Sequence, residues 1–148
     1  MSETVTVAAP SAPTSDERTL AMLAHILQMF SWFIGPLVIL LVKRESRFVS
    51  FHAIQALIWQ ATFAVVSTAG VFVVVALAFI GIPVHPGSAA QNAPTLAFFA
   101  MFSAVWLFCL GGWVVTLILA IVYGIKANQG EWACYPIIGG WARRLAKV

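Results

Sequence analysis

Apolar and polar positions follow each other along this chain in long blocks. Residues 20–42, 53–82 and 96–125 contain no Asp, Glu, Lys or Arg. At a rise of ~1.5 Å per residue the first of these blocks would extend about 35 Å as a helix, against a hydrocarbon core of roughly 30 Å. The pattern therefore predicts an all-α integral membrane bundle of three transmembrane segments, with helices over about residues 16–42, 50–82 and 95–126.

The first apolar block is interrupted by the dipeptide Gly35-Pro36. Proline removes a backbone hydrogen bond and clashes with the preceding helical turn, so a kink or a break is expected there. Two arrangements follow. The segment either crosses the membrane once as a kinked helix, or it turns back as a re-entrant hairpin.

The two ends of the chain differ from the apolar blocks. Residues 1–14 are rich in small residues and proline and predict a disordered polar tail, followed by a single membrane domain over residues 15–148. Trp132, Tyr135 and Trp141 stand near Arg143 and Arg144, and these residue types settle at the headgroup level of a bilayer. We therefore expect residues 137–148 to form a short amphipathic helix on anionic headgroups.

Composition supports a membrane protein and excludes several classes. The chain is 61% hydrophobic and only 9% charged, and its mean hydropathy is +0.96, which is unsuitable for a water-soluble domain. The net charge of +3 is small and its basic residues flank apolar blocks, so no nucleic-acid partner is expected. The lipid bilayer is the predicted partner.

The basic residues indicate an orientation. Arg18 precedes the first block, whereas the other seven of the eight basic residues lie after it in two groups, at positions 43, 44 and 47 and at positions 126, 143, 144 and 147. Under the positive-inside rule these two groups are cytoplasmic, which places the C-terminus inside, in a bacterial inner membrane. The N-terminus would be outside with three spans and inside with a re-entrant first segment.

The polar residues within the blocks are the candidates for specific contacts. His25, Gln28, Trp32 and Gly35 recur at helical spacing, and His52, Gln55 and Gln60 share a broad face of the second helix. Such faces form either hydrogen bonds between helices or the lining of a polar pathway, and the first is the commoner case. The absence of ionisable carboxylates and amines from the blocks argues against ion-coupled transport.

Metal, cofactor and enzyme chemistry find little support in the sequence. Three full spans would place His25 and His52 about 25 Å apart, near opposite faces of the membrane. A re-entrant first segment would bring them closer, but two histidines without a carboxylate or cysteine are a poor ligand set. No phosphate-binding glycine loop and no nucleophile motif occurs. We expect no cofactor, no metal and no catalytic residue.

The third block carries a row of small residues at four-residue spacing, namely Gly112, Thr116, Ala120 and Gly124. Small residues let two helix backbones approach closely in lipid, where van der Waals packing drives helix association. The row predicts close packing, either within one chain or between two copies in a homo-oligomer.

Several motifs resemble the bacterial relatives of the Tic-twenty-like family. They include Ala24-His25, Gly35-Pro36-Leu37, Phe48-Val49, His52-Ala53-Ile54-Gln55-Ala56-Leu57 and Tyr135-Pro136. Ile58 departs from the family pattern, in which a polar asparagine is expected. The resemblance implies a small membrane protein without an assigned activity, related to a subunit of a plastid protein-import translocon.

Two functions remain open from the sequence. The first is a non-enzymatic scaffold or accessory subunit of a membrane complex, and the second is a small oligomeric channel or translocation component with a pathway lined by the His and Gln faces. The segment from Phe48 to Gln55, with His52 in it, either anchors the chain at the headgroups or makes a specific contact with another helix or subunit, and we favour the specific contact.

Overall fold

The computed structural model describes residues 12–81 and 93–146. Within these ranges the chain forms five helices, α1 (Ser15–Phe30), α2 (Ile34–Val42), α3 (Arg47–Gly81), α4 (Ala93–Asn128) and α5 (Gly139–Ala146). Most of the predicted polar tail lies outside the described residues. The all-α prediction is confirmed.

Two of the helices are long enough and apolar enough to cross a membrane. Their candidate spans are Arg47–Leu77 and Phe98–Asn128, each of 31 residues, or about 46 Å at the rise of an α-helix. This length exceeds the hydrocarbon core, so the helices must tilt or reach into the headgroup regions. The expectation of three transmembrane segments is therefore not met in the described residues.

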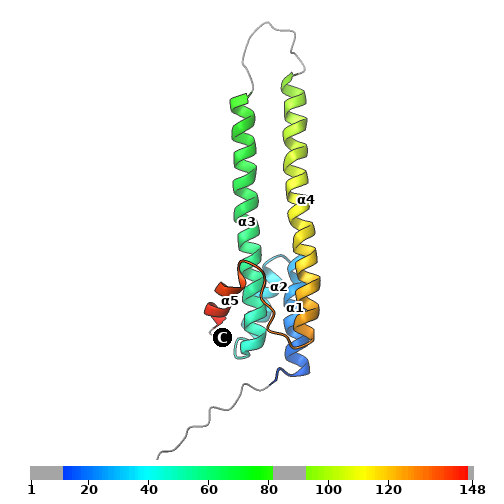
Figure 1. The fold of residues 1–148 in the computed structure, drawn as a ribbon, viewed down its shortest axis with the longest axis vertical. Coiled ribbons are helices and arrows are strands. Elements are labelled where there is room, and N and C mark those ends of the chain that lie inside the picture. Colours follow the sequence, from blue (N-terminus) through cyan, green and yellow to red (C-terminus); the bar gives the residue numbers. More distant parts are fainter. Residues whose placement is uncertain (1–11, 82–92, 147–148) are drawn as a thin grey trace, which may run out of the picture.

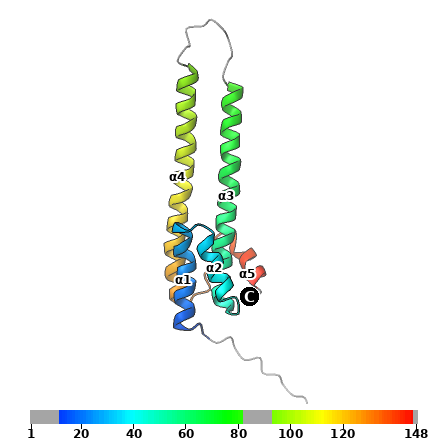
Figure 2. The same cartoon turned by 180° about the vertical axis from the view of Figure 1, so that it is seen from behind.

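The first apolar block is divided into α1 and α2, which run in opposite directions beside the ends of α3 and α4 (Figures 1 and 2). The chain reverses at Ser31–Phe33, where Trp32 adopts a left-handed backbone with φ 54°. Pro36 lies in the first turn of α2, where a missing N–H costs no helical hydrogen bond. The sequence predicted a kink or break at Gly35-Pro36, and the break lies just before it.

Ser31 and Gly35 hold this reversal together. The Ser31 hydroxyl donates to the Leu27 carbonyl (2.8 Å) and accepts from the Gly35 N–H (3.0 Å). A side chain at position 35 would bring its Cβ within 2.6 Å of Leu27 Cβ, closer than non-bonded carbons approach. Glycine is therefore the residue that lets α2 begin so close to the end of α1.

The N-terminus of α1 is fixed by a capping box. Thr14 is the N-cap residue: its hydroxyl accepts from the Glu17 N–H (3.2 Å), and the Glu17 carboxylate accepts from the Thr14 N–H (2.8 Å). The sequence pattern predicts a helix from about residue 16, one residue after the observed start of α1 at Ser15. The Glu17 carboxylate also accepts from the Ser46 hydroxyl (2.6 Å), which joins the start of α1 to the start of α3.

All charged residues in the described ranges lie at one end of the molecule (Figure 1). They are in the first turns of α1 and α3, the α2–α3 connection, the last turn of α4, the segment after it, and α5. We name this the charged end. The arrangement corresponds to the re-entrant alternative, in which both ends of the first apolar block face the same side.

Candidate functional site

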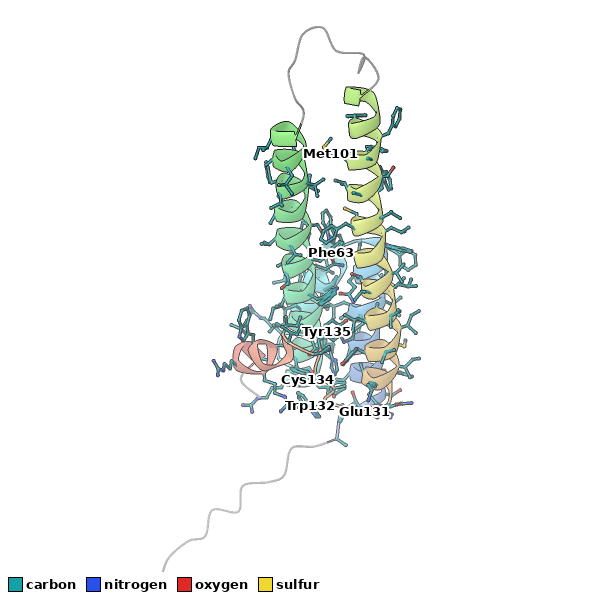
Figure 3. All side chains as sticks on the ribbon, turned by 45° about the horizontal axis from the view of Figure 1, so that its top comes forward. Phe63, Met101, Glu131, Trp132, Cys134 and Tyr135 are labelled. Carbon is teal, nitrogen blue, oxygen red and sulfur yellow. The ribbon has the colours of Figure 1, made fainter. Side chains whose placement is uncertain are left out.

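A buried polar cluster joins α1, α3 and the segment between α4 and α5. Its side chains are those of His25 and Gln28 on α1, His52, Gln55 and Gln60 on α3, and Tyr135. Tyr135 lies with Glu131, Trp132 and Cys134 in the segment that passes between the long helices near the charged end, well below Phe63 and Met101 (Figure 3). Each of the six side chains is almost completely buried.

The centre of the cluster is a chain of hydrogen bonds through two histidines. His25 Nε2 lies 3.0 Å from His52 Nδ1, and His25 Nδ1 lies 2.8 Å from the Tyr135 hydroxyl. His52 Nε2 lies 3.1 Å from the backbone carbonyl of Glu131. The separation of about 25 Å expected for three spans is not found, because α1 and α2 form a hairpin, as in the re-entrant alternative.

The Glu131 carbonyl fixes the direction of every bond in this chain. A carbonyl oxygen only accepts, so His52 Nε2 carries the proton and, in a neutral ring, Nδ1 accepts. His25 Nε2 must then donate to His52, which leaves His25 Nδ1 as the acceptor of the Tyr135 hydroxyl proton. The Gln28 amide donates to the Tyr135 oxygen (3.0 Å). These directions hold for two neutral imidazoles, the state that burial away from water favours.

The glutamines fasten the cluster to the backbone. Gln55 is bidentate: its amide donates to the Ala133 carbonyl (3.1 Å), and its carbonyl accepts from the Tyr135 N–H (2.9 Å). Gln60 donates to the Gln28 carbonyl (2.8 Å), near the end of α1. Gln28 Oε1 is buried without a protein partner.

Burial raises the pKa of the Tyr135 hydroxyl, and the nearby Tyr123 adds to this shift, whereas the hydrogen bond from Gln28 opposes it.

Aromatic rings enclose the His52 side of the cluster. Phe48 and Phe51 make edge contacts with the His52 ring, at centroid distances of 4.7 Å and 5.0 Å. Trp132 lies against both phenylalanines. The segment predicted to contact another helix or protein is thus covered by residues 131–135 of the same chain.

The row of small residues on α4 faces the inside of the molecule. The Phe63 ring lies over Gly112, Thr116 accepts from the Trp59 indole N–H (2.9 Å) and donates to the Gly112 carbonyl (3.0 Å), and Gly124 lies beside Ile26 and His25. Ala120 is fully buried. Close approach within one chain accounts for this row.

Sequence analysis missed Tyr135 and Trp59 as members of the polar contacts. Tyr135 was assigned to the headgroup region with Trp132 and Trp141, but only 2% of its surface is exposed. Its residue type gave no signal of burial, since tyrosine suits both settings. Gly35 and Pro36, by contrast, lie at the hairpin turn and not in the polar cluster.

The cluster offers little reactive chemistry. No group of three or more His, Cys, Asp and Glu side chains that could hold a metal ion occurs among the residues that the structure describes. The two histidines already use each other, Tyr135 and a backbone carbonyl as partners. The arrangement is suited to holding helices together in a low-dielectric interior, where unpaired polar groups are costly.

Comparison with known proteins gives the family. No curated protein and no solved structure matches the chain. Residues 16–142, however, match the MamF/MmsF family, described as the magnetosome magnetite crystal formation protein family. The assignment to a Tic-twenty-like family from the sequence motifs is therefore wrong. Because the match extends from the first turn of α1 into α5, the chain belongs to the MamF/MmsF family of magnetosome magnetite crystal formation proteins.

Proposed function

We propose that this protein is a non-enzymatic membrane scaffold or accessory component that supports magnetite crystal formation, the process named in its family's description. One observation carries the proposal. The two histidines, Gln28 and Tyr135, the buried side chains best suited to binding or proton transfer, are hydrogen-bonded to one another. They stabilise a fold whose exposed faces along α3 and α4 are apolar.

The channel or translocation function is less well supported. A pathway lined by the His and Gln faces would require those side chains to face an open space, whereas His25, Gln28, His52 and Gln55 are each at most 1% exposed. Beyond Gln60, the polar side chains described on α3 are those of Thr62, Ser67 and Thr68, and Thr62 already donates to the Ile58 carbonyl (2.8 Å). No row of polar groups continues toward the far end of α3.

The distribution of carboxylates bears on how such a protein would act on a mineral. Carboxylates are among the ligands that hold iron ions in proteins. The described carboxylates all lie at the charged end, on Asp16, Glu17, Glu45 and Glu131. The connection between α3 and α4 contains no acidic residue. A direct contact with a mineral at the α3–α4 connection would thus lack carboxylates, which favours an indirect role in organising other membrane proteins.

The orientation completes the proposal. Arg18 joins the other described basic residues at the charged end once α1 and α2 form a hairpin. The positive-inside rule then places this end, the N-terminus and the C-terminus in the cytoplasm. The proposed membrane is a bacterial inner membrane or the membrane around the magnetosome, the structure that the family's description names.

The experiment that tests the proposal combines crystals and partners. In the source organism, loss of the gene should change the size or number of magnetite crystals in electron micrographs, and the intact chain should restore them. The tagged chain, extracted in mild detergent, should retain other membrane proteins. Normal crystals in the deletion strain would contradict a role in crystal formation, and ion flux through vesicles containing the purified chain alone would favour the channel.

A further inference from the structure

The molecule has different cross-sections at its two ends. The short helices α1, α2 and α5 all lie beside the same end of α3 and α4 (Figures 1 and 2). The bond from Gln60 to the Gln28 carbonyl places the end of α1 at the level of Gln60, 13 positions after Arg47, or about 20 Å along α3. The hairpin therefore reaches less than half of the candidate span.

Further from the charged end, α3 and α4 contact each other without the short helices. The Phe63 ring lies over Gly112, and the Phe108 ring lies over Gly70. The outward faces of both helices expose large apolar side chains, including Val65, Phe72 and Leu107. These faces continue without a charged residue into the level of the hairpin.

The hairpin presents an apolar surface of its own. Its turn exposes Phe30 (80%), Trp32 and Phe33, and the outer face of α2 exposes five more large apolar side chains, at positions 34, 37, 38, 41 and 42. No charged residue occurs in the hairpin between Arg18 and Lys43. An apolar surface of this extent is unsuited to water, and the hairpin that carries it packs against α3 and α4.

The helix α5 adds an amphipathic surface near the same level. Ile137, Trp141 and Leu145 follow at steps of four and are all exposed, whereas Ile138, Gly139 and Ala142 are buried. Arg143 and Arg144 are exposed beside this apolar row. An apolar row flanked by arginines fits the boundary between acyl chains and anionic headgroups.

We propose that the α1–α2 hairpin and α5 insert into only one leaflet of the bilayer, the one at the charged end, with acyl chains against the hairpin and anionic headgroups on the basic residues. A helix with its side chains is ~10–12 Å wide, so α1 and α2 together add roughly 200 Å² to this leaflet and nothing to the other. The protein is thus a wedge. It favours membranes in which the leaflet at the charged end is convex.

The depth of the hairpin is tested first. In a background with Cys109→Ser and Cys134→Ser, Phe33→Cys carries a spin label in vesicles of phosphatidylcholine and phosphatidylglycerol. We expect the label to be accessible to dissolved oxygen and protected from a water-soluble nickel reagent, while a label at Glu45→Cys shows the opposite. Exposure of position 33 to the water-soluble reagent would overturn the insertion of the hairpin.

The preference for curvature is tested with the same Glu45→Cys variant and a membrane-impermeant maleimide. The chain is reconstituted into small sonicated and large extruded vesicles of the same lipids. In small vesicles the charged end should face outward, giving a ratio of outside to inside labelling roughly twofold or more above that in large vesicles. Phe72→Cys, on the exposed face of α3 within the candidate span, should remain unlabelled in both vesicle sizes and serves as the control for reaction of the maleimide with cysteines in the acyl-chain region.

The same preparations provide a second measurement that needs no variant in the hairpin. When both vesicle sizes are present during reconstitution, the small ones should contain more protein per lipid, again by about twofold or more. Equal labelling ratios together with equal protein densities would overturn the wedge. A higher protein density in small vesicles, combined with a random orientation of the charged end, would also contradict the wedge. A wedge couples its preference for curved membranes to its orientation in them.

Discussion

His25 and His52 are 27 positions apart in the chain, yet their ring nitrogens Nε2 and Nδ1 lie 3.0 Å apart in the buried interior. The contact exists because α1 and α3 lie side by side with their first turns at the same end of the molecule (Figure 1). The Glu131 carbonyl, by accepting from His52, sets the tautomers of both rings. The contact between the two histidines thus depends on the hairpin topology of the chain as well as on its packing.

Replacing His25 by phenylalanine tests the strength of this contact. The variant leaves the Tyr135 hydroxyl without its acceptor and His52 Nδ1 without its donor, and each unpaired buried group costs about 1–3 kcal/mol. We expect a clear fall in the temperature of unfolding in detergent. Met29→Leu, a partly exposed position on the same helix, is the control, and an equal stability of the two variants would contradict the hydrogen-bond chain.

Tyr135 and Gln28 should depend on each other. Tyr135→Phe removes the hydroxyl that accepts from Gln28 and donates to His25, and Gln28→Leu removes one donor to it. Because the two side chains share a bond, the double variant should lose less stability than the sum of the single variants, by roughly 0.5–3 kcal/mol. Strict additivity in denaturation curves would show that the bond from Gln28 to Tyr135 contributes nothing.

Adjacent glycines on α4 provide a matched pair. A Cβ added to Gly112 would overlap the Phe63 ring, whereas one added to Gly111 meets no atom within 4 Å. Gly111→Ala should therefore be neutral or stabilising by up to about 1 kcal/mol, since alanine is the better helix former. Gly112→Ala should lower stability or separate α3 from α4. Similar unfolding temperatures of the two variants would show that Phe63 adjusts freely.

The apolar blocks of the sequence predicted α3 and α4 well, but they could not distinguish a hairpin from a transmembrane helix in residues 20–42. Hydropathy is the same in both cases. What decides is local geometry: the Ser31 hydroxyl accepts from Gly35, and Trp32 takes a left-handed backbone. Gly35-Pro36 signalled a break, while the direction of the chain after it depends on contacts with α3.

The sequence predicted which helix faces contribute side chains to the polar cluster, but it did not predict which side chains bond to one another at its centre. The spacing of His25 and Gln28, and of His52 and Gln55, placed them on faces that contact other helices. Their pairing depends on the hairpin, and the role of Tyr135 depends on the segment after α4 returning between the helices. Gln55 holds that segment by binding the Tyr135 N–H, a contact between positions 80 apart in the chain that no local pattern encodes.

Acidification should weaken the contact between the starts of α1 and α3. The hydrogen bond from Ser46 and that from the Thr14 backbone lower the pKa of the Glu17 carboxyl below its usual 4.5. A carboxyl whose pKa is lower in the folded state stabilises the fold at pH values above its pKa in the unfolded chain. This stabilisation is lost as the pH falls through the pKa of the folded state. Glu17→Gln should therefore flatten the loss of stability below about pH 4.5. The same acid dependence in Glu17→Gln and the parent chain would assign it to other groups.

The hairpin makes a sharp prediction for membrane topology. Ala12 precedes α1 and Glu45 follows α2, and both residues are exposed at the charged end. Ala12→Cys and Glu45→Cys, each in a background without other cysteines, should react with an impermeant maleimide from the same side of the membrane, because a hairpin returns to the face from which it starts. Labelling in inverted and right-side-out membrane vesicles makes the comparison, and the positive-inside rule assigns the reactive side to the cytoplasm.

A single span through residues 20–42 would instead expose the two positions on opposite sides. That result would separate His25 from His52 by the thickness of the bilayer, and it would then exclude the hydrogen bond between them.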